Sequence, residues 1–214
     1  MASPAKTKLL RVRGLHRRFG ETEIINGLDL EVAAGRALAL IGPNGSGKST
    51  ALRCIAGADR PTSGTVELNG APVDDRSEAT RRDLAVVMDD LDFFPDLSVV
   101  EHLDLLARAH RVLEADAAVN AVLADVGLTD QANQLPGTLS SGQRRRLALA
   151  SAFVRPRKLL ILDEPEQRLD TSGLAWLADR LNAEKADGLG ILLVSHDADL
   201  VKAVADKVLD LGLR

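Results

Sequence analysis

An apolar segment, a glycine-rich loop and a helical segment follow one another near the start of the chain, and this order restricts the fold more than any other feature. Residues 36–41 are nearly all apolar, which is typical of a strand buried on both faces. Residues 42–49 fit the pattern G-x-x-x-x-G-K-[ST], and residues 48–56 then favour a helix that ends at Gly57. Together they predict a phosphate-binding loop in an α/β protein.

The residue types in this loop suit the binding of nucleotide phosphates. Glycines allow several backbone N–H groups to point at phosphate oxygens, and the start of the helix adds its positive end. Lys48 would reach the β- and γ-phosphates, and the hydroxyl of Ser49 would ligate Mg²⁺. The alternative, a glycine-rich turn with an exposed lysine, is disfavoured by the strand and helix on either side. We therefore expect a nucleotide with Mg²⁺ here.

A second apolar strand, over residues 159–162, ends in two carboxylates. Asp163 would lie at the carboxyl edge of a parallel sheet, where phosphate-loop proteins hold Mg²⁺, and would hold the metal through water. Glu164 faces a different direction and could polarise an attacking water. Such a strand end alone would be interpreted as solvated acids. The phosphate loop changes that interpretation in favour of a metal site.

Strands and helices alternate along most of the chain, which predicts a mainly parallel sheet with flanking helices. The expected strands are at residues 9–14, 28–32, 36–41, 65–69, 158–162 and 190–194, and the expected helices are at 48–56, 172–185 and 198–205. Helical segments dominate the middle, at 99–126 and 147–153. We expect one domain over residues 1–214, with a core at 8–97 and 154–212 and a helical subdomain at 98–153.

Charge and composition exclude several classes of protein. The 214 residues include 27 Lys and Arg against 31 Asp and Glu, and this net acidity argues against a chain that coats nucleic acid. The run Arg144–Arg146 is therefore interpreted as a solvated helix face. No apolar stretch approaches the ~20 residues that cross a bilayer, and the basic first 20 residues lack the apolar block of a signal peptide. We expect a cytoplasmic protein, with Cys54 as buried packing.

The run Leu139–Gln143, Leu-Ser-Ser-Gly-Gln, precedes a basic helix and distinguishes among phosphate-loop ATPases. It resembles the signature of ATP-binding cassette (ABC) proteins, which is commonly L-S-G-G-Q. The resemblance extends over about residues 8–212 and includes the order and spacing of every motif. It implies an α/β P-loop NTPase fold: an ABC-type core with a mainly parallel sheet, an N-terminal antiparallel β part and an inserted α-helical subdomain.

The resemblance also implies roles for individual residues. Nucleotide-binding residues would be Phe19, which would stack on adenine, the Walker A residues Gly42, Pro43, Asn44, Gly45, Ser46, Gly47, Lys48, Ser49 and Thr50, and the signature residues Ser140, Ser141, Gly142 and Gln143. Catalytic residues would be Lys48, Glu164, the switch histidine His196, and Asp170 of the D-loop. Ser49, Asp163 and Asp89 would bind the metal. Phe19 could instead be ordinary core.

Two such domains of the family pair head to tail, and each ATP is held between Walker A of one and the signature of the other. By this resemblance, Ser140 would offer a hydroxyl and Gly142 a closely approaching backbone N–H to the γ-phosphate. Glu164 would act as a general base or would orient the attacking water, and His196 would contact the γ-phosphate and sense its loss. ATP would hold the dimer together, and hydrolysis would release it.

The sequence departs from the family pattern at a few positions. Matching residues 94–99 to the usual F-P-x-L-[ST]-V puts Asp89 where the family has Gln. We expect Asp89 to ligate Mg²⁺ directly and to make nucleotide closure more metal-dependent; Asp90 takes this place if the alignment slips by one. Ser141 replaces the first signature glycine, and residues 167–168 replace small D-loop residues. These changes leave open whether both sites of a dimer hydrolyse ATP equally.

The function implied is the ATP-binding subunit of an ABC transporter, which couples Mg·ATP binding, dimerisation and hydrolysis to a conformational change in a membrane partner. Its partners would be a second ATPase subunit, identical or related, and a multi-span permease on whose cytoplasmic face it docks. Phe93 and Phe94 would receive a helix of the permease, although both could equally be core. The short length after His196 implies no regulatory domain and favours export. The alternative is a non-transport complex in membrane signalling, cell-wall remodelling, DNA repair or translation.

Overall fold

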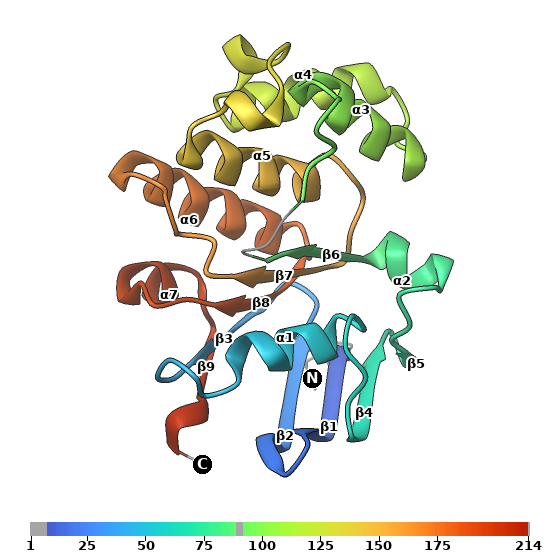
Figure 1. The fold of residues 1–214 in the computed structure, drawn as a ribbon, viewed down its shortest axis with the longest axis vertical. Helices are drawn as coiled ribbons and strands as arrows, with labels where there is room; N and C mark the ends of the chain where they lie inside the picture. Colours follow the sequence, from blue (N-terminus) through green and yellow to red (C-terminus); the bar gives the residue numbers. More distant parts are fainter. Residues whose placement is uncertain (1–7, 89–91, 214) are drawn as a thin grey trace, which may run out of the picture.

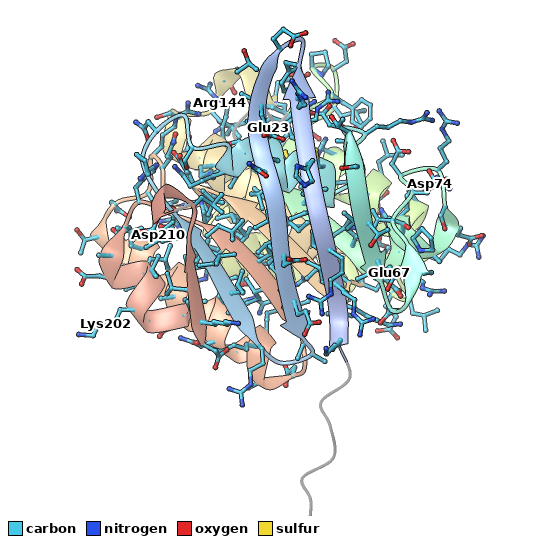
Figure 2. All side chains as sticks on the ribbon, turned by 90° about the horizontal axis from the view of Figure 1, so that it is seen from below. Glu23, Glu67, Asp74, Arg144, Lys202 and Asp210 are labelled. Atoms are coloured by element: carbon cyan, nitrogen blue, oxygen red, sulfur yellow. The ribbon has the colours of Figure 1, made fainter. Side chains whose placement is uncertain are left out.

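The computed structural model describes residues 8–88 and 92–213, and its strands form two sheets with helix α1 (Lys48–Ile55) between them (Figure 1). The first sheet is antiparallel, in the order β2-β1-β4-β5. Its strands are β1 (Lys8–Phe19), β2 (Thr22–Ala33), β4 (Ser63–Leu68) and β5 (Ala71–Pro72). Figure 2 shows its outer face, which carries charged side chains such as Glu23 and Glu67.

The second sheet is parallel throughout, in the order β6-β7-β8-β3-β9. Its strands are β3 (Ala37–Ile41), β6 (Leu84–Val87), β7 (Leu159–Asp163), β8 (Gly190–Val194) and β9 (Lys207–Asp210). Because neighbouring strands run the same way, the carboxyl ends of β7, β8 and β3 meet at one edge. Three segments that are far apart in the sequence begin at that edge: the phosphate loop after β3, Glu164 after β7 and Ser195 after β8. They therefore lie side by side.

Helices cover both faces of the parallel sheet. Besides α1 they are α2 (Glu78–Asp83), α3 (Val99–Ala109), α4 (Ala115–Asp125), α5 (Ser141–Phe153), α6 (Thr171–Ala186) and α7 (Ala198–Val204), with short 3₁₀ turns at Thr129–Gln131, Pro136–Thr138 and Leu211–Leu213. Figure 1 shows α3, α4 and α5 grouped beyond the parallel sheet, on the side away from the antiparallel sheet. The expected fold class is confirmed; the subdomain boundaries remain a prediction.

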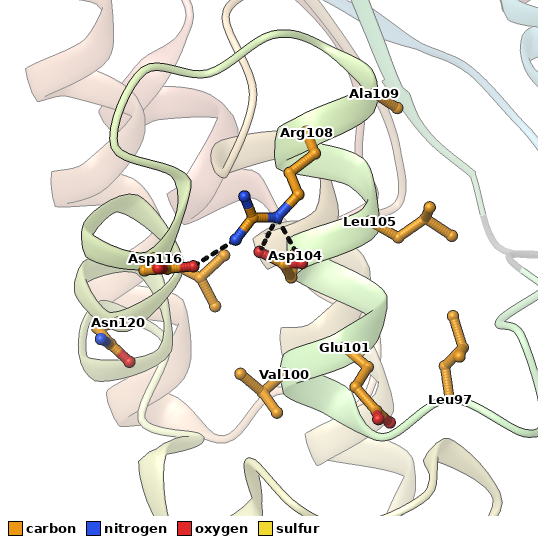
Figure 3. Close-up of a pocket in the computed structure, with 10 residues that line it drawn as sticks. Leu97, Val100, Glu101, Asp104, Leu105, Arg108, Ala109, Asp116 and Asn120 are labelled. Carbon is orange, nitrogen blue, oxygen red and sulfur yellow. Dashed lines mark hydrogen bonds and ion pairs between the residues drawn. The ribbon is translucent and has the colours of Figure 1, made fainter.

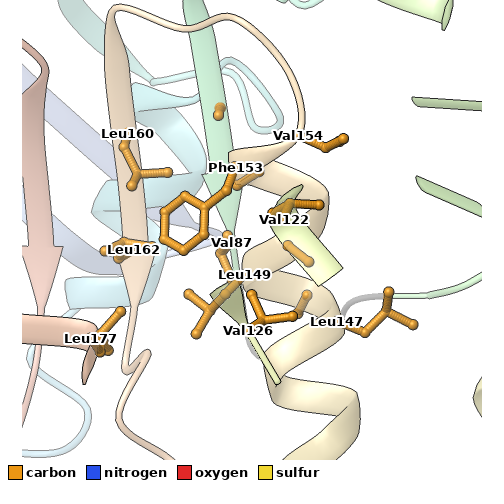
Figure 4. Close-up of a cluster of buried hydrophobic side chains, with 14 of the residues drawn as sticks. Val87, Val122, Val126, Leu147, Leu149, Phe153, Val154, Leu160, Leu162 and Leu177 are labelled. Atoms are coloured by element: carbon orange, nitrogen blue, oxygen red, sulfur yellow. The ribbon is translucent and has the colours of Figure 1, made fainter. Parts of the chain in front are cut away.

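Alternate residues of each parallel strand belong to different hydrophobic clusters. Leu160 and Leu162 of β7 pack with α4, α5 and α6 (Figure 4), whereas Leu159 and Ile161 pack toward α1 and the antiparallel sheet. Burial on both faces explains why these strands are nearly uninterrupted apolar segments. Cys54 of α1 lies in the second cluster and is almost fully buried, as the sequence predicts. Burial raises the pKa of its thiol.

The structure differs from the expected elements in the helical segment. Residues 99–126 form two helices, because Arg111 and Glu114 adopt positive φ angles of 57° and 54° and end the helical path between them. Leu113, in this turn, is 90% exposed. Strands β6 and β9 were not predicted, since each has only four residues. Among the residues that the structure describes, no helix combines the length and apolar character needed to span a bilayer.

The interpretation of Arg144–Arg146 as a solvated face is wrong for the central arginine. Arg145 is only 4% exposed. It lies three and four residues before Ala148 and Leu149, which are also buried, so all three share the inward face of α5. The spacing of residues along α5 thus places the charged side chain of Arg145 in the interior.

Candidate active site

The phosphate loop is shaped by glycines with positive φ angles. Gly42, Gly45 and Gly47 have φ values of 145°, 81° and 88°, and Gly47 is the residue that precedes helix α1. These conformations are costly for residues with a Cβ. A Cβ at Gly47 would also lie 2.9 Å from the carbonyl oxygen of Ile24, so strand β2 packs directly against the loop. A side chain at this position would therefore collide with the backbone of β2.

Lys48 is buried at the start of α1, and its ammonium group lies within the loop. Its Nζ donates hydrogen bonds to the carbonyl oxygens of Gly42 and Pro43, each at 2.9 Å. The hydroxyl of Ser46 is buried in the same loop and has no hydrogen-bond partner among the described residues. A buried polar atom of this kind favours a polar ligand, because it is costly to leave unbonded. The loop therefore offers a positive charge, a hydroxyl and a helix start to an anion.

A pocket of about 510 Å³ opens between the loop and the edge of the parallel sheet. Its lining combines residues from β2, the phosphate loop, α1 and the ends of β7 and β8: Ile24, Asn44, Gly45, Gly47, Lys48, Ser49, Thr50, Glu164 and His196. The volume is in the range of small-molecule sites. The pocket brings most of the Walker A residues together with Glu164 and His196, which lie more than 100 positions later in the chain.

Glu164 and His196 are in direct contact at the edge of this pocket. The Glu164 Oε1 atom lies 3.2 Å from His196 Nε2. Glu164 has a positive φ of 46°, which is uncommon for a residue with a side chain. Gln167 donates a hydrogen bond from Nε2 to the other carboxylate oxygen, Oε2. Both oxygens of Glu164 are therefore oriented by neighbours.

Asp163 precedes Glu164 and is the last residue of β7, with its side chain buried. Within the described ranges, no group of three or more His, Cys, Asp or Glu side chains could enclose a metal. Mg²⁺ beside a nucleotide does not need one, since it is commonly held by one or two protein oxygens together with phosphates and waters. The Asp163 carboxylate and the Ser49 hydroxyl are hard oxygen donors that fit this pattern. Asp89 and Asp90 lie outside the described residues.

The signature residues begin helix α5 and are bound to one another. Ser140 Oγ accepts from the backbone N–H of Gln143 at 3.2 Å, and Gln143 Oε1 accepts from the Ser140 N–H at 2.8 Å, which makes a capping box. A Cβ at Gly142 would lie 2.9 Å from the carbonyl oxygen of Arg168, so glycine is needed for this close approach. None of Ser140, Ser141, Gly142 and Gln143 lines the pocket described above.

Phe19 and Asp170 also lie outside the lining of that pocket. Phe19 ends β1 and is 50% exposed, with the guanidinium of Arg17 4.3 Å from its ring centre. This exposure leaves a ring face for a ligand and does not suit the alternative of a core residue. Asp170 caps α6, where its Oδ1 accepts from the backbone N–H of Gly173 at 2.8 Å. The Gly173 N–H and the Ser172 hydroxyl lower the pKa of Asp170.

Comparison with known proteins decides the family. The family model described as "ABC transporter" matches residues 25–167, about two thirds of the chain. The chain belongs to the ABC transporter family. It is an ATP-binding subunit and ATPase of that family, as the signature motif predicts.

Relatives of this ABC ATPase carry names from both directions of transport. It is 38% identical over 197 residues to the Nod factor export ATP-binding protein I of Cupriavidus pinatubonensis. The aligned region covers 90% of this chain and 60% of that protein. It is also 38% identical over 203 residues to the aliphatic sulfonates import ATP-binding protein SsuB of Pseudomonas putida, with 94% and 72% covered. The SkfA peptide export ATP-binding protein SkfE of Bacillus subtilis is 32% identical, with 94% and 84% covered.

A solved structure supports the same family. The structure titled "Structure of ATP binding subunit of ABC transporter" matches this ABC ATPase with a TM-score of 0.88 and 30% sequence identity. The match covers 95% of this chain and 87% of the other. The fold of the chain is thus that of an ABC ATP-binding subunit over almost its whole length.

Among the residues of this ABC ATPase that contact the site, Ile24 and Arg145 were not predicted. Ile24, on strand β2, lines the pocket next to Gly47. Arg145 donates to the carbonyl oxygens of Asp163 at 2.7 Å, Pro165 at 3.2 Å and Met88 at 3.3 Å, and also to that of Glu164. The helix period of α5 was the available signal for Arg145.

Proposed function

We propose that this chain is the ATP-hydrolysing subunit of an ABC transporter, and that it works as one half of a head-to-tail dimer docked on a membrane partner. The observation that carries this proposal is the pocket that contains the phosphate loop, Glu164 and His196 but no residue of the signature motif. By the family resemblance, the signature of another subunit would complete this site.

The phosphate loop would bind the nucleotide through its backbone and through Lys48. The lysine would exchange the carbonyl oxygens of Gly42 and Pro43 for β- and γ-phosphate oxygens, which carry more negative charge. Ser49 and Asp163 would hold Mg²⁺. When bound, Mg²⁺ supplies positive charge that stabilises the phosphate oxygens during transfer. Phe19 would stack on the adenine ring, since its ring is exposed at the end of the β1–β2 hairpin.

Glu164 would orient the attacking water and accept its proton. Its carboxylate lies at the pocket edge and already contacts His196 at 3.2 Å. His196 would donate a hydrogen bond to the γ-phosphate from the same side. The base and the switch histidine would then act on the water and the phosphate together, which is a positioning contribution to catalysis.

The second subunit would bring its signature against the nucleotide. The N-terminus of α5 would present the Ser140 hydroxyl and the nearby N–H groups to the γ-phosphate, with the helix dipole favouring its charge. The partner could be a second copy of this chain or a related subunit. Asp170 would lie at the boundary between the subunits.

The membrane partner would dock near the start of α3. Phe94 is 50% exposed, whereas Phe93 packs against the hydrophobic core, so the two phenylalanines expected to share one role differ. Both phenylalanines line a pocket of about 220 Å³ together with His102 of α3. A separate groove of about 680 Å³ lies between α3 and α4, with Leu97, Val100 and Leu105 among its lining (Figure 3). These apolar surfaces support the docking of a multi-span permease on the cytoplasmic face of the membrane.

The direction of transport is a separate proposal. The relatives include import and export proteins. They therefore support neither direction over the other, and substrate choice would belong to the membrane partner.

The experiment that tests this function is the capture of partners from detergent-solubilised native membranes. Tagged Glu164→Gln protein with Mg·ATP should bind the nucleotide and hydrolyse it too slowly to open the closed dimer during capture. A multi-span protein in equal amount is the expected result, and it should be lost with Lys48→Ala in the same background. Recovery of soluble proteins alone would instead indicate a non-transport ATPase.

A further inference from the structure

The turn after β7 carries side chains that bind both catalytic candidates. This turn comprises residues 164–167, and its backbone is tied to β8 by a hydrogen bond of 2.8 Å from the Glu164 N–H to the carbonyl oxygen of Val194. Gln167 closes the turn, since its N–H donates to the Glu164 carbonyl at 3.1 Å. The family pattern has small residues here, so Gln167 is a feature of this chain.

Gln167 orients the carboxylate of Glu164. Its amide Nε2 donates to Glu164 Oε2, while Oε1 of the same carboxylate faces His196 Nε2 at 3.2 Å. Two contacts on opposite oxygens fix the plane of the carboxylate. A carboxylate has about four lone-pair sites, so the group can still accept a hydrogen bond from water.

Glu166 orients the segment that carries His196. Its Oε1 atom accepts from the Ser195 hydroxyl at 2.7 Å and from the backbone N–H of His196 at 2.8 Å. Its other oxygen, Oε2, is buried and finds no hydrogen-bond partner among the described residues. Leaving such an oxygen unbonded is costly, so a carboxylate here is a poor choice for packing alone.

We propose that Glu166 and Gln167 are positioning residues for ATP hydrolysis, which hold Glu164 and His196 together as one unit. Gln167 fixes the base, and Glu166 fixes the backbone of the histidine. The proposal rests on the proposed function, because it takes Glu164 and His196 as the groups that act on water and phosphate. Displacing a reacting group by about 1 Å costs up to roughly 100-fold in rate, so loss of either contact should be measurable.

The first test compares kcat with KM. Gln167→Ala and Glu166→Ala should each lower kcat at least about tenfold and leave KM for ATP within about twofold, because neither residue lines the pocket. Glu166→Gln keeps a carbonyl oxygen in place of Oε1 and should restore most of kcat. Gln134→Ala, the same change at an exposed position between the two 3₁₀ turns that precede α5, is the matched control.

A double variant separates positioning from a general structural effect. If Gln167 acts through Glu164, then adding Gln167→Ala to Glu164→Gln should lower kcat by less than about twofold further. A full additional loss would show that Gln167 acts elsewhere and would overturn its part of the proposal.

The second test needs no turnover. Amide hydrogen exchange of His196, measured by NMR on the nucleotide-free protein, should lose protection in Glu166→Ala and keep it in Glu166→Gln. Unchanged exchange together with parental kcat would overturn the proposal. If the parent hydrolyses ATP and the variants keep its kcat, this inference alone fails. If the parent hydrolyses none, the proposed function fails and the inference fails with it.

Discussion

Arg145 donates a hydrogen bond of 2.7 Å to the carbonyl oxygen of Asp163, and this contact joins the signature helix to the end of strand β7. The same guanidinium binds carbonyl oxygens of Glu164, Pro165 and Met88. One buried side chain therefore satisfies backbone acceptors at the carboxyl ends of the neighbouring strands β6 and β7.

Arg145→Ala should destabilise the protein by about 3 kcal/mol, because it leaves several buried carbonyl oxygens without a donor. For a chain of this size that corresponds to a fall in Tm of roughly 6–12 °C. Urea unfolding and thermal melting measure both quantities. Arg76→Ala, at an exposed arginine, is the control and should change neither. A loss below about 1 kcal/mol would mean that the carbonyls find other donors.

Phe19→Ala should weaken ATP binding about 5- to 30-fold, since stacking of a base on an aromatic ring contributes about 1–2 kcal/mol. Phe19→Trp should retain binding. Titration calorimetry with Mg²⁺ and a non-hydrolysable ATP analogue measures the change. Phe94→Ala is a matched control, because Phe94 is also 50% exposed but lies in the expected docking region. Equal affinity for parent and Phe19→Ala would contradict adenine stacking.

Asp83 provides a test of acid stability. Its burial acts to raise the pKa, but hydrogen bonds from Arg82 and Lys158 outweigh this and leave the pKa below its usual value of 3.8. The Lys158 Nζ lies 2.9 Å from Asp83 Oδ2, and Asn69 donates to the same oxygen at 2.9 Å. Because the pKa of Asp83 is lower in the folded than in the unfolded protein, the ionised carboxylate stabilises the fold. This stabilisation is complete above the unfolded pKa and is lost as pH falls through the folded pKa.

Asp83→Asn should therefore cost about 2 kcal/mol of unfolding free energy at neutral pH. The difference from the parent should stay constant down to about pH 5 and should shrink below the unfolded pKa. Urea unfolding at a series of pH values measures it, with the exposed Asp187→Asn as control. A difference that grows on acidification would show that the sign is wrong.

The sequence predicts which segments meet at the carboxyl edge of the parallel sheet, because their residues lie in short local patterns. The phosphate loop needs glycines at positive φ, and Gly42, Gly45 and Gly47 have them. Asp163 and Glu164 end a strand that is apolar because both of its faces are buried. In each case the local chemistry and the buried strand require the same residue types, so a single sequence is informative.

Contacts between distant segments are harder to predict. Ile24, on strand β2, lines the pocket next to Gly47, and Glu166 contacts His196 across 30 positions. The run Arg144–Arg146 has the composition of a solvated surface. Arg145 is buried because its position on α5 lies on the face that packs inward. Strands β6 and β9 are short and gain their stability from the sheet.

The burial of Cys54 makes the chain suitable for site-specific labelling. It is the sole cysteine in the sequence, and its thiol is both covered and shifted to a higher pKa, so little of the reactive thiolate forms. A cysteine introduced at Leu113, which is 90% exposed, would react in preference to it. A single spin label or fluorophore could thus be attached to the otherwise unmodified protein. The distance between the probes of two labelled copies would then test the proposed pairing of subunits.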